Sequence, residues 1–226
     1  MSVYTTLTLK EVQDFSSPYG LEVIDLIPIQ GGIQNTNYFL ACKNGQQYVL
    51  TIFEEMDEQG AGELVPVLEH LGQAGLTVPV PLSHSGRSIQ TLKDKPAQIA
   101  PRMLGHHPMP STIGQVAEIG RAQAQMHVAL KNFPLERAEY RNHAYWRGVA
   151  RQIKPTLSPA DTVILNNLLG LYDALTAMYP NRPTGFIHSD LFRDNTLFDA
   201  DQLTGILDFY ELNKDEWLFD IAITIN

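Results

Sequence analysis

The Asn44-Gly45 pair between two β-prone runs is the feature that most constrains the fold. Asn-Gly favours the tight turn of a β-hairpin, because both residues tolerate positive φ angles. The runs on either side, Tyr38–Cys42 and Gln47–Phe53, are apolar and rich in β-forming residues. Another apolar run, Leu21–Pro28, precedes them. The sequence therefore predicts that an antiparallel sheet opens the chain.

One helix and further short strands are predicted for the rest of the first half. Apolar residues recur at three- and four-residue spacing over Gly62–Ala74, as a helix with one buried face requires. Pro66 is placed in the first turn of this helix, where proline is tolerated. Short β-prone runs follow at Ser88–Leu92 and Pro96–Met103. The turn-rich segment Leu104–Pro108 predicts a boundary between lobes.

The second half is predicted to be mainly helical. Thr112 and Gln115 form a capping-box pattern at the start of one helix, and Ser158-Pro159 starts another that Pro180 ends. Short strands are expected at Phe186–Ile187, Thr196–Phe198 and Leu203–Leu207. The pattern predicts an α+β protein with an N-terminal antiparallel sheet lobe and one main helix over residues 1–103. A mostly helical lobe with short strands would occupy residues 104–226.

Charge and composition argue against several classes of partner. The net charge is −9, the pI is near 5.2 and basic residues form no block, whereas nucleic acids and anionic membranes need a concentrated positive surface. The single cysteine, Cys42, allows no disulfide within the chain, which favours a reducing compartment. We find neither a leader-like N-terminus nor a long apolar run. The sequence therefore predicts a cytoplasmic protein with a small-molecule ligand.

The residues that indicate chemistry lie near the end of the chain. His188, Asp190 and Asn195 form the pattern His-x-Asp-x-x-x-x-Asn, and a later β-prone run ends in Asp208-Phe209. Phosphoryl transfer depends on positioning an acceptor hydroxyl and neutralising phosphate charge, for which three oxygen-bearing side chains suffice. Asp190 would accept the acceptor's proton, while Asn195 and Asp208 would hold Mg²⁺. The alternative is that the acids of the motif are solvated loop residues and that Asn195 is a turn residue. The apolar strands around the motif disfavour this alternative.

These segments resemble the aminoglycoside/choline-kinase superfamily, which has a protein-kinase-like two-lobe fold. Phe186–Asn195, Leu207–Tyr210, Phe219–Ala222, Asn35–Phe39 and Val49–Glu54 are similar to its homoserine-kinase branch, so the resemblance spans nearly the whole chain. It implies an enzyme that uses ATP and Mg²⁺ to phosphorylate the hydroxyl of L-homoserine, giving O-phospho-L-homoserine for threonine biosynthesis. A kinase of choline, an aminosugar or another amino alcohol and a non-catalytic nucleotide-binding module are the alternatives.

The resemblance also implies where the ligands bind. A glycine-containing loop, Gly31–Asn37, would cover the ATP phosphates with its backbone amides. Glu63 would be the acid of an ion pair facing the phosphate-binding strand, and the connector Ile99–Leu104 would pair its backbone with adenine. The residues implied for the nucleotide are Gly31, Gly32, Asn35, Thr36, Asn37, Thr51, Glu63, Ile99 and Met103. Those implied for the acceptor are Asp190, Tyr210 and Glu211.

Two features depart from the pattern of the resembled kinases. Where these carry a lysine that pairs with phosphate, the run Val49–Phe53 places Thr51, which supplies no positive charge. Either another cation such as Arg193 or the metal takes over, or the chain binds nucleotide poorly. The segment Asp220–Asn226 is typical of the opening of a helix and has no stop signal. Since the resembled family continues with further helices, the resemblance implies a truncated chain with an uncovered helix face.

Overall fold

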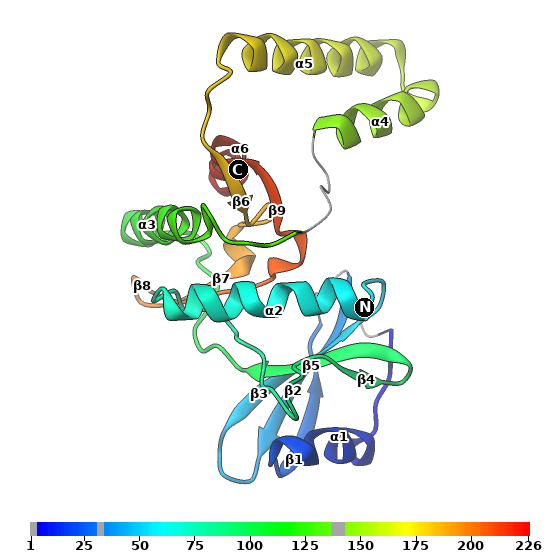
Figure 1. The fold of residues 1–226 in the computed structure, drawn as a ribbon, viewed down its shortest axis with the longest axis vertical. Coiled ribbons are helices and arrows are strands. Elements are labelled where there is room, and N and C mark those ends of the chain that lie inside the picture. The colour runs from blue at the N-terminus through cyan, green and yellow to red at the C-terminus, as the bar shows by residue number, and fades with distance from the viewer. Residues whose placement is uncertain (1–3, 31–33, 137–142) are drawn as a thin grey trace.

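The computed structural model describes residues 4–30, 34–136 and 143–226. A five-stranded antiparallel sheet is formed by the first half of the chain (Figure 1), with the strand order β1-β2-β3-β5-β4. Its strands are β1 (Val23–Pro28), β2 (Asn35–Cys42), β3 (Gln47–Phe53), β4 (Gln90–Leu92) and β5 (Lys95–Pro101). The predicted antiparallel sheet is confirmed.

The β2–β3 hairpin turns where the sequence predicted it. Gly45 has a φ angle of 83°, in the left-handed region that glycine enters without strain. The hairpin places Asn37 directly opposite Thr51. Because side chains alternate along a strand, Tyr38 and Leu40 point to the other face, where they are buried in an apolar cluster. The two faces of the sheet therefore have different chemistry.

A helix that was not predicted precedes the sheet. This helix, α1 (Leu9–Ser16), continues into the short 3-10 turn η1 (Ser17–Tyr19). A capping box starts α1, since the Thr8 side chain accepts from the Glu11 backbone N–H and the Glu11 carboxylate accepts from the Thr8 N–H. Its buried residue Val12 packs in the apolar cluster beneath the sheet. The helix thus covers the face opposite Asn37 and Thr51.

The main helix of the first half is α2 (Glu58–Gln73), which begins earlier than predicted. Asp57 caps it by accepting from the Gly60 backbone N–H at 2.8 Å. Pro66 consequently lies inside the helix and not in its first turn, so the predicted place of this proline is wrong. The buried face of α2 consists of Ala61, Leu64, Val67, Leu68 and Leu71.

Within the described ranges, the second half is mainly helical, as predicted. Its helices are α3 (Ile113–Leu130), α4 (His143–Ile153), α5 (Pro159–Met178) and α6 (Trp217–Ile225), with the short turn η2 (Lys154–Thr156) after α4. The predicted start of α3 is confirmed by a capping box between Thr112 and Gln115. That of α5 is confirmed by Ser158, which accepts from the Asp161 N–H at 3.1 Å. Figure 1 shows α4 and α5 together at one end of the molecule.

Two small antiparallel sheets lie among these helices. β6 (Thr184–Ile187) pairs with β9 (Asn213–Glu216), and β7 (Thr196–Asp199) pairs with β8 (Gln202–Ile206). The turns η3 (Arg193–Asn195) and η4 (Phe209–Glu211) precede β7 and β9. β9 was not predicted, because its polar sequence Asn-Lys-Asp-Glu has little β propensity. Its pairing with β6 stabilises the strand.

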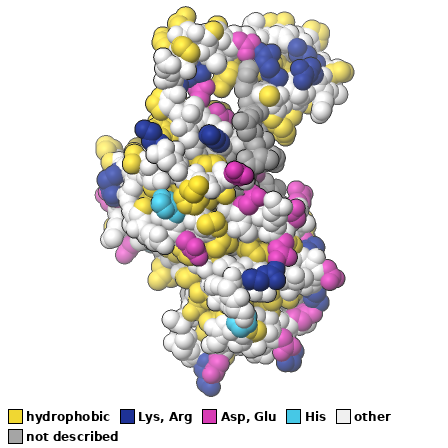
Figure 2. All heavy atoms as spheres, viewed as in Figure 1, with side chains coloured by type: hydrophobic (Ala, Val, Ile, Leu, Met, Phe, Trp, Pro, Cys, Tyr) yellow, Lys and Arg dark blue, Asp and Glu magenta, His cyan; other side chains and the backbone are white. Residues whose placement is uncertain are grey.

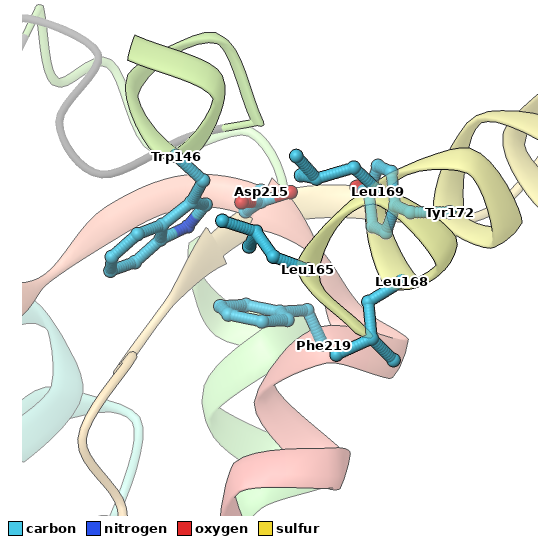
Figure 3. A pocket seen from close by; sticks show the side chains of 7 residues that line it. All are labelled: Trp146, Leu165, Leu168, Leu169, Tyr172, Asp215 and Phe219. Atoms are coloured by element: carbon cyan, nitrogen blue, oxygen red, sulfur yellow. The ribbon is translucent and has the colours of Figure 1, made fainter. Parts of the chain in front are cut away.

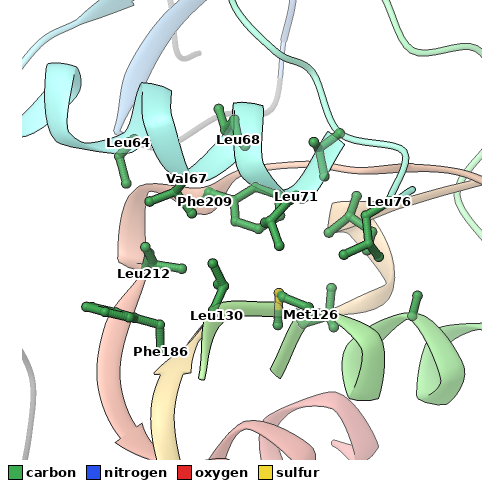
Figure 4. Close-up of a cluster of buried hydrophobic side chains, with 14 of the residues drawn as sticks. Leu64, Val67, Leu68, Leu71, Leu76, Met126, Leu130, Phe186, Phe209 and Leu212 are labelled. Atoms are coloured by element: carbon green, nitrogen blue, oxygen red, sulfur yellow. The ribbon is translucent and has the colours of Figure 1, made fainter. Parts of the chain in front are cut away.

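One apolar cluster joins the two halves of the chain. Figure 4 shows the buried face of α2 packed against side chains from α3, β6 and η4. The labelled members are Leu64, Val67, Leu68, Leu71, Leu76, Met126, Leu130, Phe186, Phe209 and Leu212. The sheet half and the helical half therefore share a core.

The connector between β5 and α3 is attached to both halves. The Arg102 guanidinium lies over the Phe39 ring of β2, 3.9 Å from the ring centroid. Further along, His106 and Phe198 of β7 exchange two backbone hydrogen bonds of 3.0 Å. Between these attachments, Gly105 has a φ angle of 133° and packs so closely on the β7–β8 hairpin that a Cβ atom would clash. Only glycine fits there.

The apolar stripe of α5 faces solvent. Leu168 is 59% exposed and Leu171 is 56% exposed, and on α6 Leu218 and Ile225 are exposed as well. The sequence predicted the stripe but not its exposure. Among the described residues, no helix combines the length and the apolar character needed to cross a membrane.

Candidate active site

Asp190 and Asn195 meet in the loop between β6 and β7. The side-chain amide of Asn195 donates to the Asp190 backbone carbonyl at 2.7 Å and to the Asp190 carboxylate at 3.0 Å. Because the amide nitrogen makes both bonds, the side-chain oxygen of Asn195 points elsewhere and remains available as an acceptor. The loop thus presents one carboxylate and one amide oxygen.

Asp208 reaches the same place from the end of β8. The Leu207 N–H donates to the Asn195 backbone carbonyl at 2.8 Å, which joins the two segments. Asp208 itself has a φ angle of 59°, in the left-handed region that non-glycine residues adopt rarely. The structure therefore brings together Asp190, Asn195 and Asp208, the three residues of the sequence motif.

Negative charge is concentrated at this junction. Loss of hydration, and then the charges of Asp190 and Glu211, raise the pKa of Asp208 to about 6, although its side chain still reaches solvent. Burial also raises the pKa of Asp190, against the opposing effect of the hydrogen bond from Asn195. A cation between these carboxylates would relieve the repulsion.

A buried carboxylate, Asp220 at the start of α6, supports the loop from behind. It accepts from the Ser189 N–H at 2.9 Å and from Nε2 of His127 on α3 at 2.7 Å. Ser189 has a left-handed φ of 67°, a conformation that persists only with such support. Burial alone would raise the pKa of Asp220, but the hydrogen bonds and the neighbouring histidines hold it below its usual value. His127 also stacks on Trp217, with 5.2 Å between centroids.

His188 links the loop to the strand that carries Asp208. Its Nε2 lies 2.8 Å from the Leu207 carbonyl, and the Asp190 N–H donates to its Nδ1 at 3.3 Å. These bonds require the neutral ring with a proton on Nε2. Burial lowers the pKa of His188 and so favours this form. The ring also packs on Phe209, with 4.6 Å between centroids.

The residues predicted for a phosphate-covering loop do not form one continuous loop. Gly31 and Gly32 lie outside the described residues. Asn35, Thr36 and Asn37 belong to β2, and pairing with β3 begins at Asn35. The predicted loop therefore extends too far along the chain. Asparagine and threonine were taken as turn formers, whereas cross-strand pairing places them in the sheet.

Thr36 lies on the opposite face of β2 from Asn37. Its hydroxyl donates to Glu54 at 2.5 Å and accepts from the Thr5 N–H at 3.1 Å. Glu54 also pairs with Lys95 of β5. Strand alternation thus directs the Thr36 side chain into a polar network behind the sheet, and its contact with nucleotide stays a prediction.

Thr51 and Asn37 interact directly. The Thr51 hydroxyl donates to the Asn37 side-chain oxygen at 2.7 Å. Glu63, predicted as an ion-pair acid, instead accepts from Gln59 at 3.1 Å on the surface of α2, and it has no ion pair in the described chain. Arg193, suggested in place of the missing lysine, is exposed in η3.

Ile99 and Met103 have different environments. Ile99 is fully buried in the cluster beneath the sheet, and its carbonyl accepts from the Leu82 N–H at 2.7 Å. A neighbouring segment thus already bonds to the Ile99 backbone oxygen, and the pairing of Ile99 with adenine stays a prediction. Met103 follows the end of β5 and is half-buried in the connector.

Tyr210 and Glu211, predicted for the acceptor, contact the sheet half of the molecule. Tyr210 packs edge-on against Phe53 of β3, with 5.3 Å between ring centroids. The Glu211 carboxylate accepts from Nε2 of Gln34 at 2.8 Å. Both residues lie in η4, directly after Asp208 and Phe209.

An apolar cavity of about 420 Å³ lies elsewhere, between α4, α5, β9 and α6. Figure 3 shows Trp146 and Phe219 among its walls, with Asp215 as a polar side chain. None of the predicted site residues that the structure describes lines it. Figure 2 shows Lys and Arg side chains at the α4 end of the molecule and, together with Asp and Glu, over the rest of that face. This cavity is separate from the acidic junction.

A family model described as the phosphotransferase enzyme family matches residues 25–226, which include the whole acidic junction. The chain belongs to the phosphotransferase enzyme family. Curated relatives of this phosphotransferase carry the name homoserine kinase. One from Janthinobacterium sp. (strain Marseille) is 34% identical over 230 residues, covering 100% of this chain and 71% of the relative. One from Neisseria meningitidis serogroup B is 36% identical, covering 100% of this chain and 74% of the relative. The predicted resemblance to that branch is confirmed.

Solved structures share the fold of this phosphotransferase. A spectinomycin phosphotransferase in complex with ADP and spectinomycin has a TM-score of 0.72 at 14% identity, covering 97% of this chain and 74% of its own. An amicoumacin kinase in complex with AMP-PNP and Ca²⁺ has a TM-score of 0.68 at 16% identity, covering 97% of this chain and 69% of the kinase. The predicted kinase-like α+β fold is confirmed.

Sequence reasoning missed the support behind the loop in this phosphotransferase. The sequence placed Asp220 in the segment Phe219–Ala222 and at the opening of a helix, but it gave no sign that Asp220 pairs with His127. The signal available was an acid in an otherwise apolar helix start, which indicates a buried partner. The contacts of Gln34 and Tyr210 with the opposite half had no sequence signal.

Proposed function

We propose that this phosphotransferase transfers a phosphoryl group from ATP to the hydroxyl of L-homoserine, giving O-phospho-L-homoserine. The observation that carries the proposal is the junction of Asp190, Asn195 and Asp208, in a chain similar along its whole length to homoserine kinases. Residues 1–103 would form the nucleotide-binding lobe and residues 104–226 the catalytic lobe. The step belongs to threonine biosynthesis.

Asp190 would act as the base that accepts the proton of the acceptor hydroxyl. Burial raises its pKa, which makes it a stronger base than an ordinary aspartate. The two bonds from Asn195 fix the direction of the carboxylate before the acceptor arrives. His188 and Asp220 hold the backbone on either side of Ser189.

The residues at the junction fit Mg²⁺ bound together with ATP. Mg²⁺ prefers oxygen ligands and binds through one or two carboxylates plus substrate phosphates, not in a cage made by protein alone. The Asp208 carboxylate and the Asn195 side-chain oxygen are ligands of this kind. Within the described chain, no group of three His, Cys, Asp or Glu side chains is arranged to hold a metal ion alone. When bound, Mg²⁺ would neutralise charge on the transferring phosphoryl group.

The nucleotide would lie against the sheet face that carries Asn35, Asn37 and Thr51, with Met103 beside the base. This face is directed toward α2 and η4, because Phe53 on the same side of β3 packs with Ala61 and Tyr210. The glycines at positions 31 and 32 would supply backbone donors to the phosphates.

An acceptor with an ammonium group but no carboxylate, such as choline or an aminosugar, is the second candidate. The carboxylates around Asp190, namely Asp194, Asp208 and Glu211, attract such a cation. Homoserine carries a carboxylate as well, so its site needs a cationic side chain. Arg193, exposed in η3 between Asp190 and Asn195, would serve. Arg193→Gln should therefore raise the KM for homoserine and leave that for choline unchanged.

Coupled ADP release with Mg²⁺-ATP and a panel of L-homoserine, choline and an aminoglycoside tests the proposal. We expect turnover on homoserine and a decrease in kcat of about 10²–10⁴-fold for Asp190→Asn, with ATP affinity retained in calorimetry. Asp199→Asn, which changes an exposed aspartate on β7, is the matched control and should behave as wild type. Unchanged turnover in Asp190→Asn would exclude the assigned base.

A further inference from the structure

The N-terminal segment, residues 4–7, is held against the back of the sheet by side chains of β2. The Thr36 hydroxyl accepts from the backbone N–H groups of Tyr4 and Thr5, at 2.9 and 3.1 Å. Two residues along the strand, the Tyr38 hydroxyl donates to the Thr5 carbonyl at 2.9 Å. The segment is not a strand itself, so these side chains supply partners for its backbone groups.

The Thr36 hydroxyl uses its whole hydrogen-bonding capacity in this arrangement. Besides accepting two bonds, it donates its proton to the Glu54 carboxylate at 2.5 Å. A hydroxyl has one proton and two acceptor lone pairs, so all of them are engaged. Thr36 is completely buried, and water therefore cannot replace a lost partner. A side chain without the hydroxyl would remove three bonds at once.

The Glu54 carboxylate joins three parts of the sheet half. Glu54 follows the last residue of β3, and its side chain is only 9% exposed. One oxygen accepts from Thr36 of β2, and the other pairs with Lys95, the first residue of β5. Lys95 also donates to the Thr5 hydroxyl at 3.0 Å. Hydrogen bonds to charged groups are stronger than those between neutral groups, so this carboxylate is the main connection at the open end of the β2–β3 hairpin.

The neighbours of Thr36 point to the opposite face, where the nucleotide would lie. Side chains alternate along a strand, so Asn35 and Asn37 face away from the network. Asn37 accepts from Thr51 at 2.7 Å, whereas Asn35 lies opposite Phe53 in the last pair of the described register. A strand end opens more easily than the middle of a strand. The network behind Thr36 therefore limits the movement of Asn35 and Asn37.

We propose that Glu54 is a positioning residue for nucleotide binding, which holds Thr36 from behind and thereby fixes Asn35 and Asn37 where the ATP phosphates would lie. The inference rests on the proposed function. Glu54 acts through the strand, because its side chain lies on the face opposite the nucleotide. Groups that are fixed before a ligand arrives lose less freedom on binding, so loosening the network should weaken nucleotide binding and leave acceptor binding unchanged.

The network itself is tested without ligand, by a double-mutant cycle on thermal unfolding. Thr36→Val and Glu54→Met each remove one partner of the same bond and keep a side chain of similar size. We expect the decrease in Tm of the double variant to be smaller than the sum of the single decreases. Glu22→Met is the matched control, since Glu22 pairs with Lys43 at the closed end of the hairpin and is 73% exposed. Its effect should add to that of Thr36→Val, and additive decreases for Thr36→Val and Glu54→Met would overturn the network.

The role of Glu54 is tested by calorimetric titration with AMP-PNP and Mg²⁺, at a temperature at which every variant is folded. Loss of a hydrogen bond to a charged group should weaken AMP-PNP binding about tenfold in Glu54→Met, and Glu22→Met should bind as wild type. In turnover, the KM for ATP should rise and the KM for homoserine should stay the same. Glu54→Met with wild-type affinity for AMP-PNP, or with both KM values raised, would overturn the positioning role.

A pair of substitutions at Thr36 keeps the test decisive if Glu54→Met does not fold. Thr36→Val should weaken AMP-PNP binding, and Thr36→Ser should recover most of the lost affinity because serine keeps the hydroxyl. Equal affinities of these two variants would refute the role of the network. A loss of affinity in Thr36→Val but none in a folded Glu54→Met would instead indicate direct contact between Thr36 and nucleotide, and would also overturn the role of Glu54.

The two proposals can fail separately. A wild-type protein that binds AMP-PNP but phosphorylates no acceptor of the panel would refute the proposed function. The AMP-PNP affinities of the variants and the unfolding cycle would still decide for or against the role of Glu54. Normal homoserine turnover together with a Glu54→Met variant that is indistinguishable from wild type would refute the role of Glu54 alone.

Discussion

The surroundings of the Asp208 carboxylate disfavour its negative charge in the ligand-free protein, and a bound cation would stabilise that charge. Lost hydration and the charges of Asp190 and Glu211 raise its pKa, and its backbone is left-handed. Lost hydration and the two charges disfavour the ionised carboxylate, and the left-handed backbone is unfavourable for aspartate whatever its protonation state. Binding sites commonly retain such local strain because a ligand relieves it.

Asp208→Asn should stabilise the ligand-free protein at neutral pH and lose this advantage in acid. The pKa of Asp208 is about 6 in the folded chain against an ordinary value of 3.8. The folded state therefore binds the proton more tightly, so wild-type stability falls as pH rises through this window, whereas the amide does not titrate. Thermal unfolding from about pH 4 to about pH 8 should show a Tm difference that grows with pH. A constant difference would reflect only the tolerance of asparagine for the left-handed backbone.

At this scale the sequence predicted the motif residues but not their support. Asp190 and Asn195 are close in the chain, so their spacing specified the contact. His127 and Asp220 are separated by 93 residues, and nothing in either local sequence identifies the partner. The side-chain direction of Thr36 depends on strand register, which the sequence of β2 alone does not specify.

Arg182 attaches the end of helix α5 to β9. Arg182 forms two hydrogen bonds of 2.5 Å with Glu216 of β9. It also donates to the carbonyls of Leu175 and Tyr179, at 3.0 and 2.7 Å, which belong to the last turn of α5 and its cap. A cation at a helix C-terminus satisfies carbonyls that have no partner in the helix and complements the dipole.

Arg182→Ala should loosen the end of α5 while leaving the sheet half intact. The substitution removes the Arg182 guanidinium from the Glu216 carboxylate, which is only 17% exposed. Hydrogen exchange should accelerate in the last turns of α5 and in β9. Arg121→Ala is the control, since Arg121 pairs with Glu118 on the surface of α3 and surface pairs contribute little. Equal protection of α5 in both variants would contradict the role of Arg182.

Elements with strong local signals were predicted, and those without were missed. Nearby residues determine the Asn44-Gly45 turn and the caps of α3 and α5, so the sequence predicted these features correctly. β9 is stabilised by its pairing with β6, and no local sequence pattern predicts this pairing. The start of α2 was placed late, because the cap at Asp57 lies before the apolar residues used to find the helix.

Across the whole molecule, the shared core makes the two halves interdependent. Side chains of α2 contact those of α3, β6 and η4 in one cluster. The sequence showed that α2 has a buried face, but periodicity does not identify the partners of that face. The sequence likewise predicted two lobes, but it did not show that α2 would pack against both of them.

Leu68→Ala should therefore destabilise the whole protein in a single unfolding transition. Leu68 is 5% exposed in the shared core, and removing a buried leucine side chain costs about 2–5 kcal/mol. Leu168→Ala is the matched control, because Leu168 is 59% exposed on α5 and its truncation should change stability by less than about 0.5 kcal/mol. Denaturant unfolding followed by fluorescence and circular dichroism measures both. Separate transitions for the two halves would contradict a common core.

The connector after β5 has a consequence for movement between the halves. The chain is attached at Arg102 on one side and at His106 on the other, so only Met103, Leu104 and Gly105 lie between these attachments. Gly105 is pressed against the β7–β8 hairpin, which reaches the loop of Asn195 directly. Any rotation of the sheet half would therefore pivot next to the catalytic loop, so opening and closing would displace the far end of the sheet most and the nearby loop least.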